Sequence, residues 1–249
     1  MTVLLLGLAA RPAGEGWLGL CLPLVAIPFL YWELPLLNQA LAAGYHDPVV
    51  VGWERALFGG EPARELAGAL PWVWLSEPLH VAYLMLYPLI FVPPLLLLVR
   101  REKEAFRTTV FGLMLAALAC YLVFVYFPVQ GPRYFGPPEG VPDGPVRRLT
   151  LAVLEQGSSR GSAFPSSHVG IMTAQSILAL VYQRRFGVVV SLVTVALAFG
   201  AVYGGFHYGV DVLVGGCVGG VSAWVALRFV RADASTPASR PTAASDIAG

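Results

Sequence analysis

The chain has 249 residues, of which 57% are hydrophobic and only 12% are charged, and its mean hydropathy is +0.68. Soluble domains carry about 25% charged residues, so this composition excludes an ordinary soluble domain and predicts an integral membrane protein. The formal net charge of +1 gives no general attraction to nucleic acid, and we expect no nucleic-acid partner.

Apolar runs long enough to cross a bilayer predict six transmembrane helices. We place them at residues 17–34, 79–99, 108–127, 166–182, 187–205 and 206–229. The expected fold class is therefore all-α, a polytopic membrane protein built as a six-helix bundle. Residues 1–16 begin with an apolar run too short to span, so we expect an interfacial or half-inserted start; a cleaved signal peptide would need a basic N-terminal region that is absent.

Three further segments connect or flank these spans. Residues 38–74 mix aromatic and charged side chains, which predicts a short helix lying flat at the interface. Residues 128–165 form a long loop rich in Pro, Gly and Arg. We treat 1–230 as a single membrane domain with a core at 57–229, and the tail 231–249, rich in Ala, Ser, Thr and Pro, as disordered.

Basic residues orient the bundle. With six spans, three basic clusters fall on one side: Arg100–Arg107, Arg184–Arg185 and Arg228–Arg231. The positive-inside rule makes that side the cytoplasm. We therefore expect both termini in the cytoplasm of a bacterial-type cytoplasmic membrane, and the 128–165 loop on the outer face. Arginines on that outer loop suggest an anion to bind.

His207 and Asp211 are ionisable residues in a membrane segment, which marks them as functional candidates. Their i, i+4 spacing places both on one face if the helix includes them. A carboxylate that accepts a hydrogen bond from one imidazole nitrogen leaves the other nitrogen free as a base or nucleophile. The alternative is a buried pair that only joins helices. His46 and His80 lack such a partner and are interpreted as ordinary interfacial residues.

The run 164–168, Phe-Pro-Ser-Ser-His, stands at the outer start of the fourth span. Ser166 or Ser167 can cap the helix that follows, and the free N–H groups of a helix start bind anions. His168 in the first turn could give a proton to a leaving oxygen. A simple capped helix is the alternative. Arg133 follows the outer end of the third span, so three distant segments deliver polar groups to one membrane face.

These residues resemble the type 2 phosphatidic acid phosphatase superfamily over residues 57–229. The 164–168 run is similar to its Pro-Ser-Gly-His signature, with Ser167 in place of Gly. Residues 200–211 resemble its third signature, Ser-Arg, five residues, His, three residues, Asp, but Gly200 and Ala201 stand at the Ser-Arg positions. Residues 130–135 resemble the first signature, although Arg133 follows its proline and Tyr126 stands at the Lys position. The reduced signatures look like the inositol phosphorylceramide synthase branch.

The resemblance implies a metal-independent reaction in two steps, with no cofactor. His207 would attack phosphorus, Asp211 would orient His207, and His168 would protonate the leaving group. The phosphoryl oxygens would be held by Arg133, Ser166 and Ser167. We expect Arg160 to join Arg133 in place of the missing arginine, and Arg147 and Arg148 to face solvent or headgroups.

The implied partners are membrane lipids and a substrate that is a phosphomonoester or diphosphate lipid. Two alternatives stay open. One is a transferase that moves a phospho-headgroup to an alcohol, as inositol phosphorylceramide synthases do. The other is a non-catalytic lipid-binding membrane protein.

Overall fold

A computed structural model describes residues 17–41 and 44–235. The predicted interfacial start at 1–16 lies outside these residues, as does the predicted tail from 236 onward. The described chain folds into α-helices in this order: α2 (Trp17–Leu41), α3 (Asp47–Phe58), α4 (Pro62–Ala69), α5 (Val73–Leu84), α6 (Leu86–Val99), α7 (Lys103–Tyr126), α8 (Pro145–Gly157), α9 (Ser167–Tyr182), α10 (Arg184–Tyr203) and α11 (Gly209–Ser235), with a short 3-10 helix, η1 (Pro132–Phe135).

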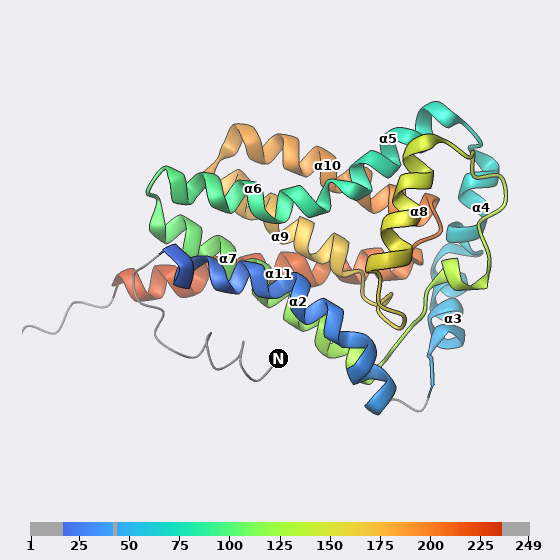
Figure 1. Cartoon of the computed structure of the whole chain (residues 1–249), viewed down its shortest axis with the longest axis horizontal. Coiled ribbons are helices and arrows are strands. Elements are labelled where there is room, and N and C mark those ends of the chain that lie inside the picture. The colour runs from blue at the N-terminus through green and yellow to red at the C-terminus, as the bar shows by residue number, and fades with distance from the viewer. Residues whose placement is uncertain (1–16, 42–43, 236–249) are drawn as a thin grey trace, which may run out of the picture.

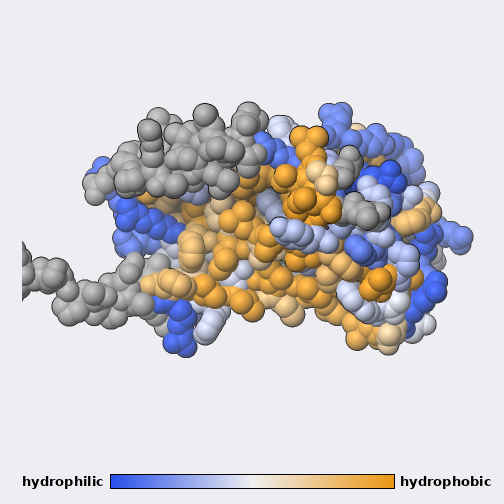
Figure 2. Space-filling view, turned by 90° about the horizontal axis from the view of Figure 1, so that it is seen from below, coloured by the Kyte–Doolittle hydropathy of each residue, from blue (hydrophilic) through white to orange (hydrophobic). Residues whose placement is uncertain are grey.

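The long helices run side by side along the longest axis, and α3, α4 and α8 lie across one end of the bundle (Figure 1). We call this the capped end. The first turn of α2 and the last turn of α11 lie at the opposite end (Figure 1). Figure 2 shows an apolar middle with hydrophilic residues gathered toward both ends, the surface expected of a protein that crosses a bilayer.

The described residues confirm the all-helical fold class but not the count of six spans. Within residues 17–41 and 44–235, four helical segments are long and apolar enough to cross a membrane: Gly19–Asn38, Lys103–Tyr126, Arg184–Tyr203 and Gly209–Phe229. A fifth is obtained if α5 and α6, which meet at an angle of 49°, count as one bent span. α9 is apolar but has only 16 residues, which is below the usual length of a span.

The bend between α5 and α6 has a local cause. Pro88 stands in the first turn of α6 and has no N–H to donate to the carbonyl of Leu84. Its ring also crowds that carbonyl, so a continuous helix through Met85 is disfavoured. The predicted span at 79–99 is therefore part of a longer segment, 73–99, that bends in its middle.

Four further sequence predictions about the segments and about His80 differ from the structure. The interfacial segment at 38–74 forms two helices, α3 and α4, because Gly59 adopts a left-handed conformation and ends α3. The 128–165 loop contains a whole helix, α8, which begins with a proline in its first turn. α11 extends to Ser235, so residues 231–235 are helical. His80 is not interfacial: it is 1% exposed, and its Nδ1 lies 2.7 Å from the carbonyl oxygen of Ser76.

The core lies where α9 packs against α7, α10 and α11. Its largest buried side chains include Phe106, Leu113, Phe124, Met172 and Leu178. α11 approaches α9 closely through two glycines. A Cβ at Gly215 would collide with the carbonyl oxygen of Ser166, and one at Gly219 with that of Gly170. Small residues at this spacing permit backbone contact between membrane helices.

Gly220 provides a matched control for this contact, because a Cβ there would meet nothing within 4 Å. We expect Gly219→Val to lower the free energy of unfolding by about 1–3 kcal/mol, the usual cost of overpacking a tight interface. Gly220→Val should change it little. The measurement is denaturant unfolding of both variants in detergent, and equal losses would show that α9 and α11 do not depend on this contact.

Candidate active site

His207 lies in the turn that joins α10 to α11, not on a helix with Asp211 as the spacing predicted. The backbone N–H groups of Phe206 and His207 both donate to the carbonyl of Ala201, at 2.9 and 3.1 Å. Gly205 adopts a φ of +70° in this turn, a conformation that glycine reaches without strain. α11 then begins at Gly209, so Asp211 stands in its first turn and His207 precedes it.

The imidazole of His207 has two acceptors on one side. Its Nδ1 lies 3.0 Å from the carbonyl oxygen of Ala163 and 3.4 Å from Oδ2 of Asp211. A carbonyl can only accept a hydrogen bond, so Nδ1 carries the proton and Nε2 keeps its lone pair. Sequence reasoning predicted the carboxylate as the partner, but it did not find the backbone carbonyl, which lies closer.

His207 is neutral near pH 7. Its side chain is 5% exposed, and burial lowers the pKa of His207 to about 4 because a charged imidazolium is poorly solvated there. The positive charge of Arg133 lowers the pKa further, whereas the hydrogen bond to Ala163 opposes the shift. A neutral imidazole with a free Nε2 is the form that a nucleophile requires.

Asp211 is fully buried and connects two helices. Its Oδ2 accepts a hydrogen bond from the backbone N–H of Tyr208 at 2.8 Å. Its own carbonyl accepts the N–H of Ser166, the residue before α9, at 2.9 Å. Within the described chain, its Oδ1 has no hydrogen-bond partner. The carboxylate can therefore shift toward a positive charge that develops on His207.

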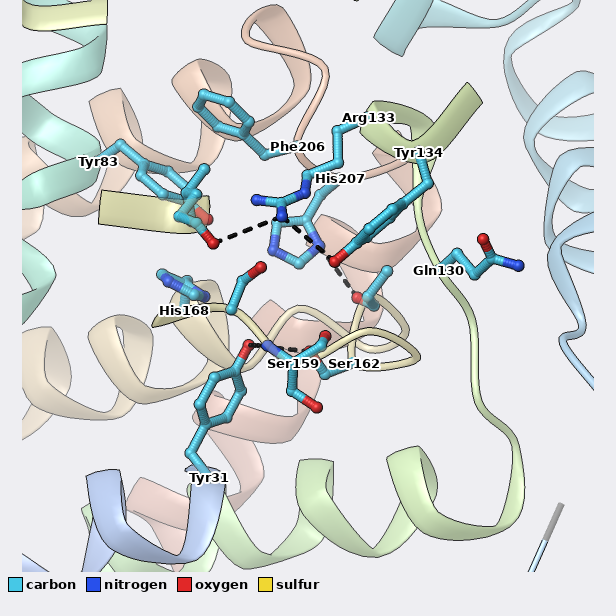
Figure 3. A pocket seen from close by; sticks show the side chains of 13 residues that line it. Tyr31, Tyr83, Gln130, Arg133, Tyr134, Ser159, Ser162, His168, Phe206 and His207 are labelled. Atoms are coloured by element: carbon cyan, nitrogen blue, oxygen red, sulfur yellow. Dashed lines mark hydrogen bonds between the residues drawn. The ribbon is translucent and has the colours of Figure 1, made fainter. Parts of the chain in front are cut away.

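His168 stands in the first turn of α9, on the other side of the same cavity (Figure 3). Its ring stacks on Tyr83 with centroids 4.9 Å apart and planes 15° apart, and its centroid is 5.8 Å from that of His207. Nε2 of His168 has no hydrogen-bond partner among the described residues. The two imidazoles therefore share one small polar space.

Arg133 also lines this cavity, from the 3-10 helix η1. Its guanidinium donates weakly to the hydroxyl of Tyr134 at 3.2 Å and to the carbonyl of Leu154 at 3.5 Å. The cavity has a volume of about 30 Å³, close to the share of one water molecule. Its lining is completed by Tyr31, Tyr83, Gln130, Tyr134, Leu154, Ser158, Ser159, Ser162, Ala163 and Phe206.

The other predicted phosphate ligands lie outside this lining. Ser166 is buried, and its Oγ accepts the N–H of Val169 at 3.4 Å, so it caps α9 as the sequence predicted. Ser167 lines a neighbouring apolar cavity. Arg160 is exposed at the rim, where it donates two hydrogen bonds to Oε1 of Gln130 and lies over the rings of Tyr45 and Tyr134.

The remaining two arginines of the 128–165 segment differ from each other. Arg148 is exposed and pairs with Asp143 at 3.1 Å, whereas Arg147 is only 9% exposed. The expectation that both face solvent or headgroups is therefore wrong for Arg147. α8 packs against α5, and the backbone N–H groups of Val146 and Arg147 donate to the carboxylate of Glu77 on α5.

Two buried carboxylates that the sequence analysis missed hold the capped end together. Glu54 accepts the N–H groups of Gly209 and Val210, both at 2.9 Å, and so caps α11. Asp47 accepts those of Gln130 and Gly131 at 3.0 and 2.9 Å, next to Arg133. Both lie on the buried face of α3. The sequence contained a signal for both residues: Asp47 and Glu54 are seven residues apart in a helix that begins with Asp-Pro, which places them on the same helix face.

No group of three or more His, Cys, Asp or Glu side chains that could hold a metal ion occurs within residues 17–41 and 44–235. The structure thus assembles one polar site from segments that are remote in sequence: η1, the loop before α9, the first turn of α9 and the turn before α11.

The chain was compared with known proteins. The family model described as the PAP2 superfamily matches residues 50–225, which confirms the resemblance predicted from the signatures. No curated protein and no solved structure matched the chain. The matched range contains η1, α9 and the start of α11, and therefore both imidazoles and Arg133.

The low pKa of His207 makes a prediction about stability. The unfolded imidazole titrates near 6.5 and the folded one near 4, so between these values the unfolded state binds more protons. The free energy of unfolding should then fall as the pH drops through this window, by at most ~1.4 kcal/mol per pH unit from this group. We expect His207→Gln to remove this contribution to the dependence of the free energy of unfolding on pH. The measurement is denaturant unfolding of the wild type and the variant between pH 4.5 and 7.5. If the free energy of unfolding depends on pH identically in both proteins, His207 is not a buried neutral imidazole.

Proposed function

We propose that this protein is a membrane lipid phosphatase that acts through a phosphohistidine. The chain belongs to the PAP2 superfamily, whose members are generally phosphatases. The observation that carries the proposal is the position of His207. Its Nδ1–H is held by Ala163 and its free Nε2 shares a cavity with His168 and Arg133. These three residues supply a nucleophile, an acid and a cation.

In the first step, Nε2 of His207 attacks phosphorus while the bond from phosphorus to the leaving oxygen breaks. His168, protonated once the negative phosphate is bound beside it, gives its proton to that oxygen, and the carboxylate of Asp211, 3.4 Å from Nδ1, stabilises the positive charge on His207. In the second step, His168 takes a proton from a water molecule. The resulting hydroxide attacks phosphorus, and the bond between nitrogen and phosphorus breaks.

Arg133 is the residue best placed to neutralise the phosphoryl oxygens. Its present contacts, at 3.2 and 3.5 Å, are long for hydrogen bonds and can be exchanged for shorter bonds to a phosphate. Arg160 could reach the same group from the rim by leaving Gln130. Ser166 and Ser167 would contribute only if the first turn of α9 shifts, since neither lines the cavity.

The surroundings of the site support a lipid substrate. The cavity lies at the capped end of a bundle whose middle is apolar (Figure 2), so an amphiphile in the bilayer could present its phosphate there. We propose six crossings, with the bent pair α5–α6 and the short α9 each counted as one. The basic residues between α6 and α7 and at the start of α10 then mark the cytoplasmic side and leave the site on the outer face.

Trapping of the intermediate tests the reaction. Purified protein given phosphatidic acid labelled with ³²P should acquire an acid-labile, base-stable label, and His207→Gln should acquire none and lose turnover by roughly 10³-fold or more. Inositol and glycerol are added in parallel. A labelled inositol or glycerol product would identify a transferase instead. Neither label nor product with any lipid phosphate, in protein that still binds the lipids, would leave a non-catalytic binding protein.

The arginines are tested separately. Loss of one charged hydrogen-bond partner costs about 1.5–3 kcal/mol, so Arg133→Ala should slow turnover about tenfold to a hundredfold. Arg160→Ala should have a smaller effect, because Arg160 reaches the site only from the rim. Lys should restore Arg133 only in part, since it cannot form a bidentate pair. The exposed Arg148→Ala is the control, and a defect there equal to that of Arg133→Ala would show that the wrong cation has been chosen.

A further inference from the structure

An apolar cavity of about 470 Å³ adjoins the phosphate site. We call it the side groove. It lies between α2, α6, α7, α8 and the start of α9, and it shares four lining residues with the polar cavity: Tyr31, Leu154, Ser158 and His168. Its volume falls in the range of ~300–1,000 Å³ typical of small-molecule sites. One ligand could therefore occupy both spaces.

One wall of the side groove comes from outside the part of the chain that the family model matches. α2 contributes Ile27, Pro28, Tyr31 and Trp32, whereas the matched range begins at residue 50. Trp32 is 65% exposed and Tyr87, opposite on α6, is 41% exposed. Both lie on membrane-facing helices, so the groove has a mouth toward lipid and an inner end at His168.

We propose that the side groove binds one hydrocarbon chain of the substrate, and that α2 thereby forms part of the substrate site. This inference rests on the proposed function. The apolar lining offers few partners to a polar ligand, whereas a hydrocarbon chain can enter it from the bilayer without passing through water. The junction at His168 places the head of such a molecule in the polar cavity, beside His207 and Arg133.

Tyr31 couples the groove to the reacting centre as a positioning residue. Its hydroxyl accepts the N–H of Ser159 at 3.2 Å and lies 2.9 Å from Oγ of Ser162 (Figure 3). Ser162 gives its own hydrogen to the carbonyl of Ser159, so Tyr31 donates to Ser162. The next residue, Ala163, holds Nδ1 of His207. A chain packed against the Tyr31 ring would fix this loop and, through it, the imidazole.

Binding is measured with alkylphosphonates from butyl to hexadecyl, which have no ester bond to hydrolyse, on full-length protein in lipid nanodiscs, after subtraction of empty nanodiscs. Affinity of the wild type should rise at least tenfold along the series. Ile90→Trp should abolish the rise, because Ile90 is buried on α6 and lines the groove, which has room for the larger side chain. Val92→Trp, on the exposed face of the same helix, should retain it. The same rise in both variants would overturn the proposal.

A second variant tests the coupling. Tyr31→Phe keeps the ring and removes the two hydrogen bonds, so it should bind hexadecylphosphonate like the wild type while kcat for hexadecyl phosphate falls several-fold. An unchanged kcat would overturn the positioning role. The experiments also distinguish failure of the proposed phosphatase activity from failure of the proposed side groove. Groove binding without turnover of any phosphate ester would refute the phosphatase alone, and turnover without dependence on chain length or on Ile90 would refute the groove alone.

Discussion

The close approach of α9 and α11 is the contact on which the site depends. Gly215 and Gly219 let the two backbones touch, and the N–H of Ser166 then reaches the carbonyl of Asp211. That contact brings the first turn of α9, with His168, opposite the turn before α11, with His207. A larger side chain on either glycine would separate the helices and, with them, the two imidazoles.

A second constraint comes from the helix start itself. The first N–H groups of a helix have no partner within it, and leaving them unpaired in apolar surroundings is costly. α11 begins among buried side chains, and the carboxylate of Glu54 satisfies two of these groups. α3 therefore does more than cover the bundle. It fixes where α11 begins and hence where the turn with His207 ends.

The sequence was informative where a single physical property decides the outcome. Hydropathy predicted the long apolar helices, although not the count of spans, and spacing, residue type and the family signatures singled out His168, His207, Asp211 and Arg133 as site candidates. It was less informative where the partner is a backbone atom or a residue far along the chain. Nothing local in the sequence indicates that the carbonyl of Ala163 meets His207, 44 residues later. α8 was missed because its Pro-Gly-rich flanks concealed a 13-residue amphipathic helix.

The carbonyl of Ala163 has a consequence for how such a site tolerates mutation. That oxygen belongs to the backbone, and the neighbouring bonds that fix it, from the N–H of Ala163 to Val129 and from the N–H of Val129 to Gly161, are also between backbone atoms. The orientation of His207 is thus encoded in the path of the chain. Alanine scanning would not isolate this contact, because position 163 is already alanine, Val129 is buried in the core, and Gly161, with a φ of +91°, has no room for a Cβ.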